Sequence, residues 1–425
     1  MQSAPRSLHA LIDQMRGVTT AFGLKEVPSI FDRFDEITGG GIQLHWDIRE
    51  RARAPSCNGK YASLSGCKKA ILCMTHKKGY EGPKTELHRE TNGVLIEFPT
   101  WRVLSIMPPI TETTFKEDRL RDDFSKYTVY PLLDGTTVNL YYAGEWIICT
   151  PNAIDARHHT WLGDSTYEAA LNQLLNSHPE FSYDRLSKTR CYTLLFKHPD
   201  FHPCAFEPPR IHFIQSCNVG APSLGVTRND DIGLPKHESV NVTFDEVMKC
   251  TRAAITRPKS SESVRYGYVL RAPPKSGLCD LTIEAPLMKY IRYVIYDMPH
   301  QQSREIQLHD PDQRVYYFVL RAQMVPAYRE HFLSVFPQYG ELFNWCDVMF
   351  ETIANKLIAM HANGGRCDQT AESVAASTLM NILKGENINI NSSHAKSIID
   401  DFIRDPNRLN VMHACLCIIR TAQRS

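Results

Sequence analysis

The sequence predicts an α+β fold, in which antiparallel sheets are flanked by helices and followed by a helical C-terminal domain. Residues 130–156 contain runs of β-branched and aromatic residues joined by a tight turn at Ala143 and Gly144, a pattern typical of a hairpin. Residues 167–175 combine helix formers with an apolar face that would cover one edge of that sheet. Beyond residue 300, apolar residues recur at helical spacing, in segments 325–336, 339–360, 369–384, 393–404 and 406–421.

Composition limits the classes of function. The 425 residues are 43% hydrophobic, enough for a sizeable core. No apolar run is long enough to cross a bilayer, so we expect no membrane partner. The 48 basic and 47 acidic residues give a formal net charge of +1, which provides no long-range attraction for nucleic acid. Any nucleic-acid binding must therefore come from local basic patches, and sequence-specific DNA binding is not expected.

The thirteen cysteines predict a reducing compartment. Their number is odd, they follow no regular framework, and no apolar signal segment follows Met1. We therefore expect the protein in the cytoplasm or in a particle assembled there. Cys57, Cys67, Cys73 and His76 carry metal-binding atoms, but their spacing differs from that of paired zinc knuckles, and we assign no metal site to them.

The first 90 residues form a partly irregular, locally basic region. Residues 3–22 predict an amphipathic helix whose apolar face carries Leu8, Leu11, Ile12 and Met15. A packing helix is favoured over an arm that binds a partner. We place a central domain at residues 91–300 and the helical domain at residues 301–425.

One strand of the hairpin region is interrupted by Asp134, Gly135 and Thr136. A carboxylate and a glycine are poor strand formers, so they either form a β-bulge or serve a ligand. A glycine lets a ligand approach the backbone, and an acidic residue with a hydroxyl can hold a ribose and phosphates. If the strand is continuous, Asp134 and Thr136 share one face and Asn139 lies on the other unless a bulge intervenes.

This segment resembles motif I of the lysine-dependent nucleotidyltransferases, a lysine followed two residues later by an acidic residue and glycine. It is most similar to phage-type RNA ligases and the RNA ligase-like proteins of large cytoplasmic DNA viruses. Leu132 stands where the nucleophilic lysine belongs. The matching residues are Asp134, Gly135, Thr136, Trp146, Thr150, Ile154, Asp155 and Ala156.

Two further motifs match in part, and each lacks its carboxylate. Residues 191–204 resemble the ligase segment whose glutamate contacts the ribose or supports a metal, and Lys197 falls at that glutamate. Residues 265–271 resemble motif IV, with Tyr266 at its glutamate and Gly267 in agreement. Lys289 and Arg292 resemble the basic residues of motif V that hold the α-phosphate, although an ordinary amphipathic helix would place them equally well on one face.

The resemblance implies a nucleotidyltransferase core related to ATP-grasp-like ligases, with ATP and magnesium as cofactors. Because leucine cannot attack a phosphate, we predict impaired ligase chemistry and a module that binds RNA ends or a viral protein partner. An active ATP-dependent ligase with a relocated nucleophile and a structural component of a virus particle are the alternatives. The resemblance implies nucleotide binding by Asp134, Gly135, Thr136, Thr150, Lys289 and Arg292, and RNA binding by Arg271 and Lys197.

His158 and His159 form an adjacent pair that could suggest acid–base chemistry. On a strand, adjacent side chains point to opposite faces, so at most one could enter a site. We do not assign them a catalytic role.

Overall fold

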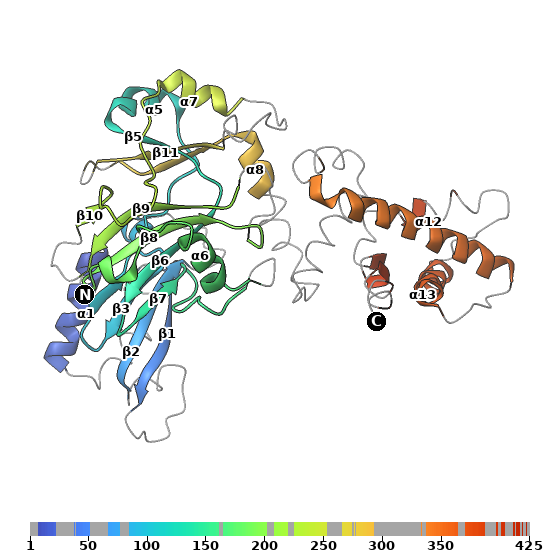
Figure 1. Ribbon diagram of the computed structural model, residues 1–425, viewed down its shortest axis with the longest axis horizontal. Helices are drawn as coiled ribbons and strands as arrows, with labels where there is room; N and C mark the ends of the chain where they lie inside the picture. Colours follow the sequence, from blue (N-terminus) through green and yellow to red (C-terminus); the bar gives the residue numbers. More distant parts are fainter. Residues whose placement is uncertain are drawn as a thin grey trace.

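Three antiparallel sheets make up most of the described structure (Figure 1). The computed structural model describes residues 7–22, 38, 40–51, 67–76, 85–160, 165–201, 208–219, 225–252, 266–273, 276 and 278–292, then 333, 337–363, 370–386 and short runs between 397 and 422. The α+β class predicted from the sequence is confirmed, with antiparallel sheets first and helices at the C-terminal end.

The first sheet has the order β1-β2-β3-β4, formed by β1 (Ile42–Arg51), β2 (Cys67–His76), β3 (Val94–Phe98) and β4 (Arg102–Ser105). Helix α1 (Leu8–Phe22) packs on it, and Leu8, Leu11, Ile12 and Met15 share one core with residues of β2 and β3. The predicted packing face of this helix is thereby confirmed. The boundary drawn at residue 90 passes through this sheet and its core, next to α4 (Glu86–Glu90).

The second sheet has the order β10-β9-β8-β6-β7. Its strands are β6 (Thr136–Tyr142), β7 (Trp146–Cys149), β8 (Arg190–Lys197), β9 (Arg210–Asn218) and β10 (Val226–Thr227). The turn between β6 and β7 lies at Gly144, whose φ is 97°. Helix α6 (Tyr167–Leu175) covers one face, and its Leu171 and Leu174 pack with Phe196, Ile211 and Phe213. The predicted hairpin and helix are both present, but the helix covers a face of the sheet and not the edge that we expected.

The third sheet has the order β12-β11-β5, from β5 (Thr128–Pro131), β11 (Gly267–Arg271) and β12 (Leu281–Glu284). Helices α5 (Glu117–Asp123) and α7 (Phe244–Cys250) lie over its outer face, where Leu120, Val247 and Leu270 share a core. Helix α7 begins with a capping box: the Thr243 backbone N–H donates to the Glu246 carboxylate at 2.7 Å, and the Glu246 backbone N–H donates to the Thr243 hydroxyl.

The chain passes from the third sheet to the second at Asp134 and Gly135. We expected one interrupted strand here, and the structure instead has two strands in different sheets, because β5 ends at Pro131 and β6 begins at Thr136. The expectation that Asp134 and Thr136 share a strand face is therefore wrong, since Asp134 belongs to the crossover. Asn139 lies within β6 and is fully buried, and its Nδ2 donates to the Ser105 hydroxyl at 2.8 Å.

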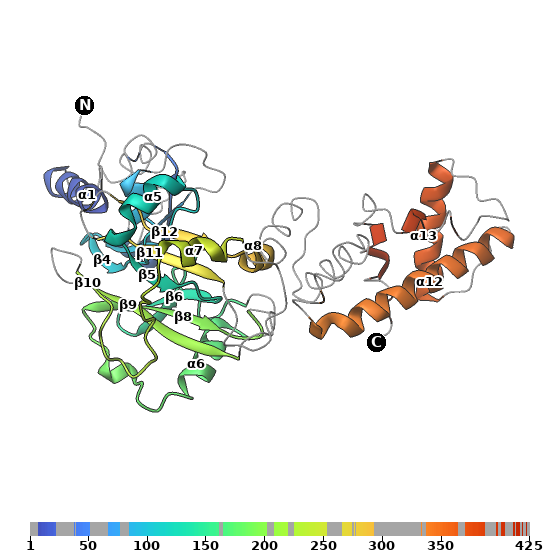
Figure 2. The ribbon, with the colours of Figure 1, turned by 90° about the horizontal axis from the view of Figure 1, so that it is seen from above.

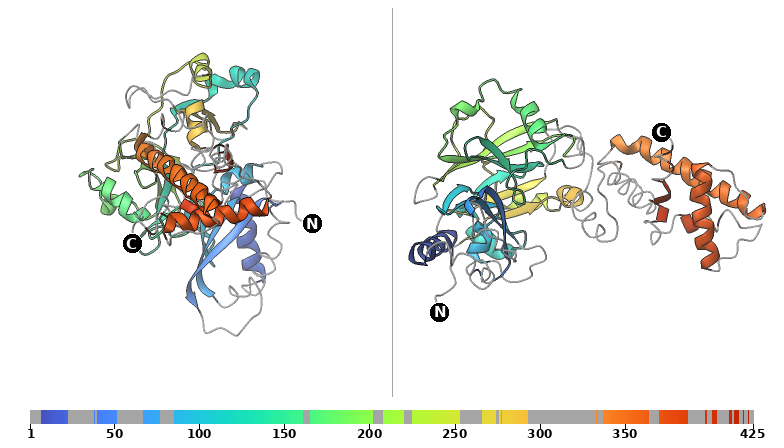
Figure 3. Two further views of the ribbon diagram at one scale, coloured as in Figure 1. Left: turned by 90° about the vertical axis from the view of Figure 1, so that its right-hand side faces the viewer. Right: turned by 90° about the horizontal axis from the view of Figure 1, so that it is seen from below.

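At the C-terminal end, α12 (Gly340–Ala362) and α13 (Ala371–Gly385) lie to one side of the sheets, as Figures 1, 2 and 3 all show. Their buried residues form one hydrophobic cluster that also includes Tyr266 and, from α8 (Pro286–Arg292), Leu287 and Met288. The other three predicted C-terminal helices fall largely outside the described residues. In the part of the chain that is described, no helix is both long and apolar enough for a membrane span.

Candidate functional site

Several of the predicted site residues gather where the second and third sheets face each other, a region that we call the interlayer. Strand β8 supplies residues to both of its faces: Leu194 and Phe196 pack beneath α6, so the alternation of side chains turns Lys197 the other way. Its side chain reaches the hydroxyl of Tyr266, directly before β11 of the third sheet. The interlayer is thus lined from both sheets and from the Asp134 crossover.

A buried ion pair occupies the centre of the interlayer. The Lys197 Nζ donates to the Asp134 Oδ2 at 2.8 Å, and the two side chains are 2% and 3% exposed. The same Nζ lies 3.4 Å from the Tyr266 hydroxyl and 5.7 Å from the centre of its ring. A buried charge is tolerated when it is paired and hydrogen-bonded, and here each charge has that compensation.

Gly135 fixes the crossover against β8. A Cβ atom at this position would come within 2.5 Å of Leu195 Cδ2 and 2.9 Å of the Phe196 carbonyl oxygen. The neighbouring strand therefore makes the close approach that we had expected of a ligand. The glycine brings Asp134 within reach of Lys197, and that is its structural role.

Leu132 occupies an apolar environment. Its backbone N–H donates to the Gly267 carbonyl at 2.9 Å, and its half-buried side chain packs against the hydrophobic cluster that contains Tyr266, Leu287 and Met288. A leucine at the position of the motif I lysine is therefore integrated into the packing of the interlayer wall.

Glu284 is a carboxylate that the sequence comparison missed. It stands opposite Gly267 in the pairing of β11 with β12 and is 8% exposed. Gly267 has a φ of 132°, and a Cβ there would lie 2.0 Å from the Ile283 carbonyl oxygen, so the two strands meet very closely at this point. An acidic residue ending the otherwise non-acidic strand Leu281–Glu284 was the available signal.

The remaining predicted residues are not all brought to the ion pair. Thr136 begins β6 beside Phe196, whereas Thr150 closes a turn with Ala153 beyond edge strand β7, and each is half-buried. Lys289 is exposed on α8. Burial raises the pKa of the nearby Cys250 thiol to about 11, although the positive charge of Lys289 opposes this rise. Arg292 belongs to α8, but its side chain lies outside the described residues.

Arg271 is paired with a carboxylate, as Lys197 is. Its Nη1 donates to the Asp280 Oδ2 at 2.7 Å, and both side chains are 14% exposed. The two residues predicted to bind RNA are thus both engaged by acidic partners within the protein.

Several basic and imidazole side chains of the interlayer were not singled out from the sequence. Arg210 stands opposite Lys197 in the pairing of β9 with β8, and His212 stands opposite Leu195. His237 donates through Nε2 to the Pro131 carbonyl at 2.7 Å, which joins the segment after β10 to β5. The pKa of His212 is lowered to about 4, mainly by burial and then by the charge of Arg210. The pKa of His237 is lowered by burial and by Arg271 and Arg210.

The ion pair does not suit a divalent metal. Magnesium in proteins is usually held by carboxylates and waters, but here the Asp134 carboxylate is already neutralised by an ammonium at 2.8 Å. In the described part of the chain, no group of three or more histidine, cysteine, aspartate or glutamate side chains could hold a metal ion. The residues present therefore do not fit the metal-assisted adenylation that the resemblance implies.

The other motifs considered from the sequence have ordinary structural environments. His158 and His159 are exposed and lie in a turn after Ala156, so the strand geometry assumed for them is wrong. Cys73 is buried with its Sγ 3.8 Å from the Pro151 carbonyl, and His76 contacts the His88 carbonyl. Cys57 and the Cys67 side chain lie outside the described residues.

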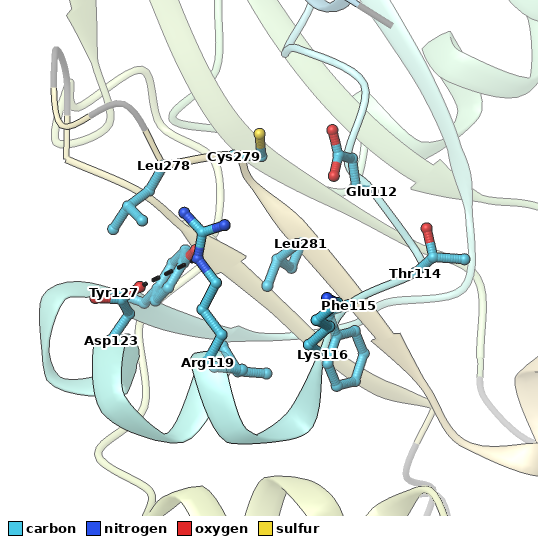
Figure 4. A pocket seen from close by; sticks show the side chains of 11 residues that line it. Glu112, Thr114, Phe115, Lys116, Arg119, Asp123, Tyr127, Leu278, Cys279 and Leu281 are labelled. Carbon is cyan, nitrogen blue, oxygen red and sulfur yellow. Dashed lines mark ion pairs between the residues drawn. The ribbon is translucent and has the colours of Figure 1, made fainter. Parts of the chain in front are cut away.

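A pocket of about 560 Å³ lies on the other side of the third sheet, against α5 (Figure 4). Its walls combine apolar side chains with exposed charges, and Arg119 lies 4.0 Å from Asp123. Cys279 faces it, and burial raises the pKa of that thiol. The lining residues are Glu112, Thr114, Phe115, Lys116, Arg119, Leu120, Asp123, Tyr127, Leu278, Cys279 and Leu281, so the pocket contains none of the predicted site residues.

The chain is similar to viral proteins named for RNA ligation. It is 24% identical over 338 residues to the "Putative RNA-ligase" of African swine fever virus strain Badajoz, covering 70% of this chain and 72% of the relative. A protein of the same name from a Malawi tick isolate is 23% identical over 309 residues, covering 62% and 67%. No family model matches the chain.

Two solved structures are also similar. An archaeal ATP-dependent RNA ligase is 12% identical with a TM-score of 0.40, covering 94% of this chain and 99% of that one. A Naegleria gruberi RNA ligase variant with ATP and Mn is 13% identical with a TM-score of 0.29, covering 52% of this chain and 64% of that one.

Proposed function

Because the chain is an RNA ligase-like homologue of these African swine fever virus proteins, we propose that it binds RNA without forming a covalent adenylate. The observation that carries this proposal is the buried ion pair between Lys197 and Asp134, at 2.8 Å. In a ligase, the acidic residue of motif I serves the nucleotide and a lysine two residues before it forms the bond to AMP. In this chain the carboxylate serves a structural ammonium instead.

Three substitutions act together against ligase chemistry. Leu132 has no lone pair with which to attack the α-phosphate, so the covalent route is closed at the motif I position. Lys197 and Tyr266 stand where two carboxylates would act, and they satisfy each other and Asp134 through hydrogen bonds. The set is internally compensated, and this favours a stable non-catalytic interlayer over a site that has lost one catalytic residue.

RNA is the preferred partner because basic side chains line the interlayer on both sheets. Arg210 and His212 come from the second sheet and Arg271 from the third. A net charge of +1 supplies no general attraction, so contacts with phosphates must be local. If the protein does not bind RNA, binding to a viral protein or incorporation into a virus particle becomes the leading alternative. For all of these functions we propose a location in the cytoplasm or in a particle.

The direct test is adenylation. Wild-type protein is incubated with α-labelled ATP and either magnesium or manganese, and protein-linked label is measured after denaturation. We expect no lysine-linked AMP, because the motif I position carries an aliphatic side chain. A stoichiometric adduct would refute the proposal, and mapping it would identify the nucleophile.

A matched pair of variants sharpens this test. Leu132→Lys alone restores an amine but leaves Lys197 on Asp134, so we expect no adduct. The triple variant Leu132→Lys, Lys197→Glu, Tyr266→Glu restores all three motif residues, and we expect measurable labelling if the interlayer still admits ATP. Labelling of the single variant to the level of the triple variant would show that the ion pair does not prevent adenylation.

The second candidate function is an active RNA ligase that uses a relocated lysine as its nucleophile. One observation favours it, because the Lys197 Nζ lies 2.8 Å from Asp134, the acidic residue of motif I. An ammonium that donates to a carboxylate has no lone pair available, and its position on β8 differs from that of a residue preceding Asp134. Lys197→Arg separates the two candidates, because arginine keeps the charge and cannot form the usual phosphoramidate. Label that is present in wild type and absent from this variant would establish Lys197 as the nucleophile.

A further inference from the structure

We propose that Cys191 and Cys217 form a peroxide-sensitive thiol pair, which hydrogen peroxide converts into a disulfide between β8 and β9. The two residues stand directly opposite each other in the antiparallel pairing of these strands. Both side chains are buried in a hydrophobic cluster between the first and second sheets. The pair lies away from the interlayer and does not depend on RNA binding.

The backbone sets a distance between the two cysteines that a disulfide can span. The Val219 N–H donates to the Thr189 carbonyl at 3.0 Å, so these two residues form a hydrogen-bonded pair. Such pairs recur at every second residue, which makes Cys191 and Cys217 the next one. Their Cα atoms are then about 5.5 Å apart, within the range of about 4.4–6.8 Å that disulfides span. The bond therefore needs no large backbone movement.

Two other thiols share the cluster but do not meet this condition. Cys149 lies on β7, and β6 separates β7 from β8, so two strand spacings of about 4.8 Å lie between Cys149 and Cys191. Cys73 belongs to the first sheet, and stacked sheets lie about 10 Å apart. Both distances exceed the limit of about 7 Å for a disulfide. Among the described residues, these thiols form no group that could hold a metal ion.

Hydrogen bonds make Cys191 the more reactive member of the pair. While it is protonated, its Sγ donates to the Ile106 carbonyl at 3.8 Å, and as a thiolate it accepts from the Ile106 N–H at 3.4 Å. A hydrogen bond with the Cys217 thiol holds the pKa of Cys191 below its usual value, although burial opposes this. The same hydrogen bond and burial raise the pKa of Cys217. Because the thiolate is the nucleophile, Cys191 reacts first.

A small oxidant can reach the pair at the end of the sheet. Arg190 and Asn218, the neighbours of the two cysteines, are the last paired residues of β8 and β9. Strand β10, on the other side of β9, is two residues long, and its Val226 stands opposite Cys217 and is 48% exposed. Strand ends open more readily than strand centres, and hydrogen peroxide is small and uncharged.

The reaction balances with hydrogen peroxide as the oxidant. The Cys191 sulfur attacks one peroxide oxygen, the O–O bond breaks, and the departing hydroxide takes up the former thiol proton to become water. The Cys217 sulfur then attacks the resulting sulfenic acid, forming the S–S bond, and the hydroxyl group leaves as water with the Cys217 proton. Both sulfurs are oxidised and one peroxide is reduced. In a reducing cytoplasm the pair stays as thiols, whereas in a particle outside the cell the bond would persist.

The test treats folded, full-length protein with hydrogen peroxide, blocks the remaining thiols with iodoacetamide in denaturant and digests the protein with trypsin. Cys191 and Cys217 fall in separate tryptic peptides, 191–197 and 211–228, each with a single cysteine. We expect mass spectrometry to show these peptides joined, with the loss of two hydrogen atoms, and to show them separate after reduction. In untreated protein both should be separate and blocked.

Variants distinguish the first thiol from the second. In Cys217→Ala the sulfenic acid has no partner, so dimedone, which traps sulfenic acids, should label Cys191 more strongly than in wild type. In Cys191→Ala, Cys217 should remain a free thiol after peroxide treatment. Cys149→Ala removes another buried thiol of the same cluster and should leave the joined peptides unchanged. Each variant is accompanied by a thermal melt, and the wild-type result stands by itself if a variant fails to fold.

Two results would overturn the proposal. One is that peroxide leaves both peptides of the wild-type protein separate and blocked. The other is that Cys217 joins Cys149 or Cys73 as often as it joins Cys191, because the register of β8 and β9 would then not select the partner. Protein unfolded in denaturant and treated in the same way provides the reference for unselected joining.

Discussion

The interlayer holds two charged groups that are adjacent in the fold and opposite in character. Asp134, Lys197 and Tyr266 are buried and internally paired, and the Lys197 side chain is 2% exposed. Arg210, His212 and His237 are half-buried, and their neighbours are mostly basic. The buried pair satisfies its own charges, whereas burial and nearby positive charges lower the pKa of both histidines in the second group.

The largest expected effect comes from breaking the buried pair. Asp134→Asn leaves the Lys197 ammonium buried without its counter-charge, so we expect the free energy of unfolding to fall by about 3–5 kcal/mol. The measurement is equilibrium unfolding in urea. The double variant Asp134→Asn, Lys197→Met should recover part of the loss, because it leaves no isolated charge.

An exposed pair provides the control. Asp13 and Arg16 on α1 are 3.4 Å apart with side chains 52% and 53% exposed, so Asp13→Asn should cost less than about 1 kcal/mol. Equal losses for Asp134→Asn and Asp13→Asn would mean that the interlayer pair is solvated and that the contrast drawn here does not hold.

Acid should lower the stability of the folded protein through His212. The pKa of His212 is lowered from 6.5 to about 4 in the folded protein, so between these values the unfolded chain binds a proton that the folded chain does not. Stability should therefore be complete above pH 6.5 and decline as the pH falls toward 4. Because the side chain is half-buried, we expect a loss of about 1–2 kcal/mol after solvent screening.

Unfolding curves across this pH range test the expectation. His212→Gln should flatten the decline, while His158→Gln, which alters an exposed histidine, should not. If wild type and His212→Gln lose stability in parallel, His212 does not resist protonation in the folded state.

Periodicity and turn chemistry predicted much of the fold. The amphipathic face of α1, the hairpin of β6 and β7 and helix α6 all depend on residues close in sequence, and all are present. The crossover at Asp134 could not be predicted in this way. Whether residues 130–142 form one strand or two depends on which partners each half finds, and those partners, β11 and β8, lie far along the chain.

The site was predictable where a motif marked it and not elsewhere. Leu132, Lys197 and Tyr266 were each identified as departures from a pattern, but their contact requires two sheets to meet. The pairing of Lys197 with Asp134 spans 63 positions, and no local rule indicates it. Arg210 and His212 alternate with buried apolar residues on β9, which reads equally well as an ordinary solvated strand face.

The smallest expected effect on stability concerns α8, where the resemblance placed two phosphate-binding residues. Lys289 is exposed and Arg292 follows three positions later on the same helix, so reversing both charges should change the free energy of unfolding by less than about 0.5 kcal/mol. If both contact phosphates, Lys289→Glu, Arg292→Glu should weaken binding of a 5′-phosphorylated oligoribonucleotide whatever its sequence. The salt slope should fall by about two ions' worth, since phosphate contacts position RNA without specifying it.

Comparing this variant with Arg210→Gln in the same salt titration apportions binding between α8 and the interlayer. If both variants bind RNA more weakly than wild type, the bound RNA contacts both the interlayer and α8. Unchanged affinity and slope in the α8 variant, with loss in Arg210→Gln, would remove Lys289 and Arg292 from the site. Recognition would then rest on side chains for which the motifs of an RNA ligase assign no role, which is the result expected if binding was retained after the nucleophile was lost.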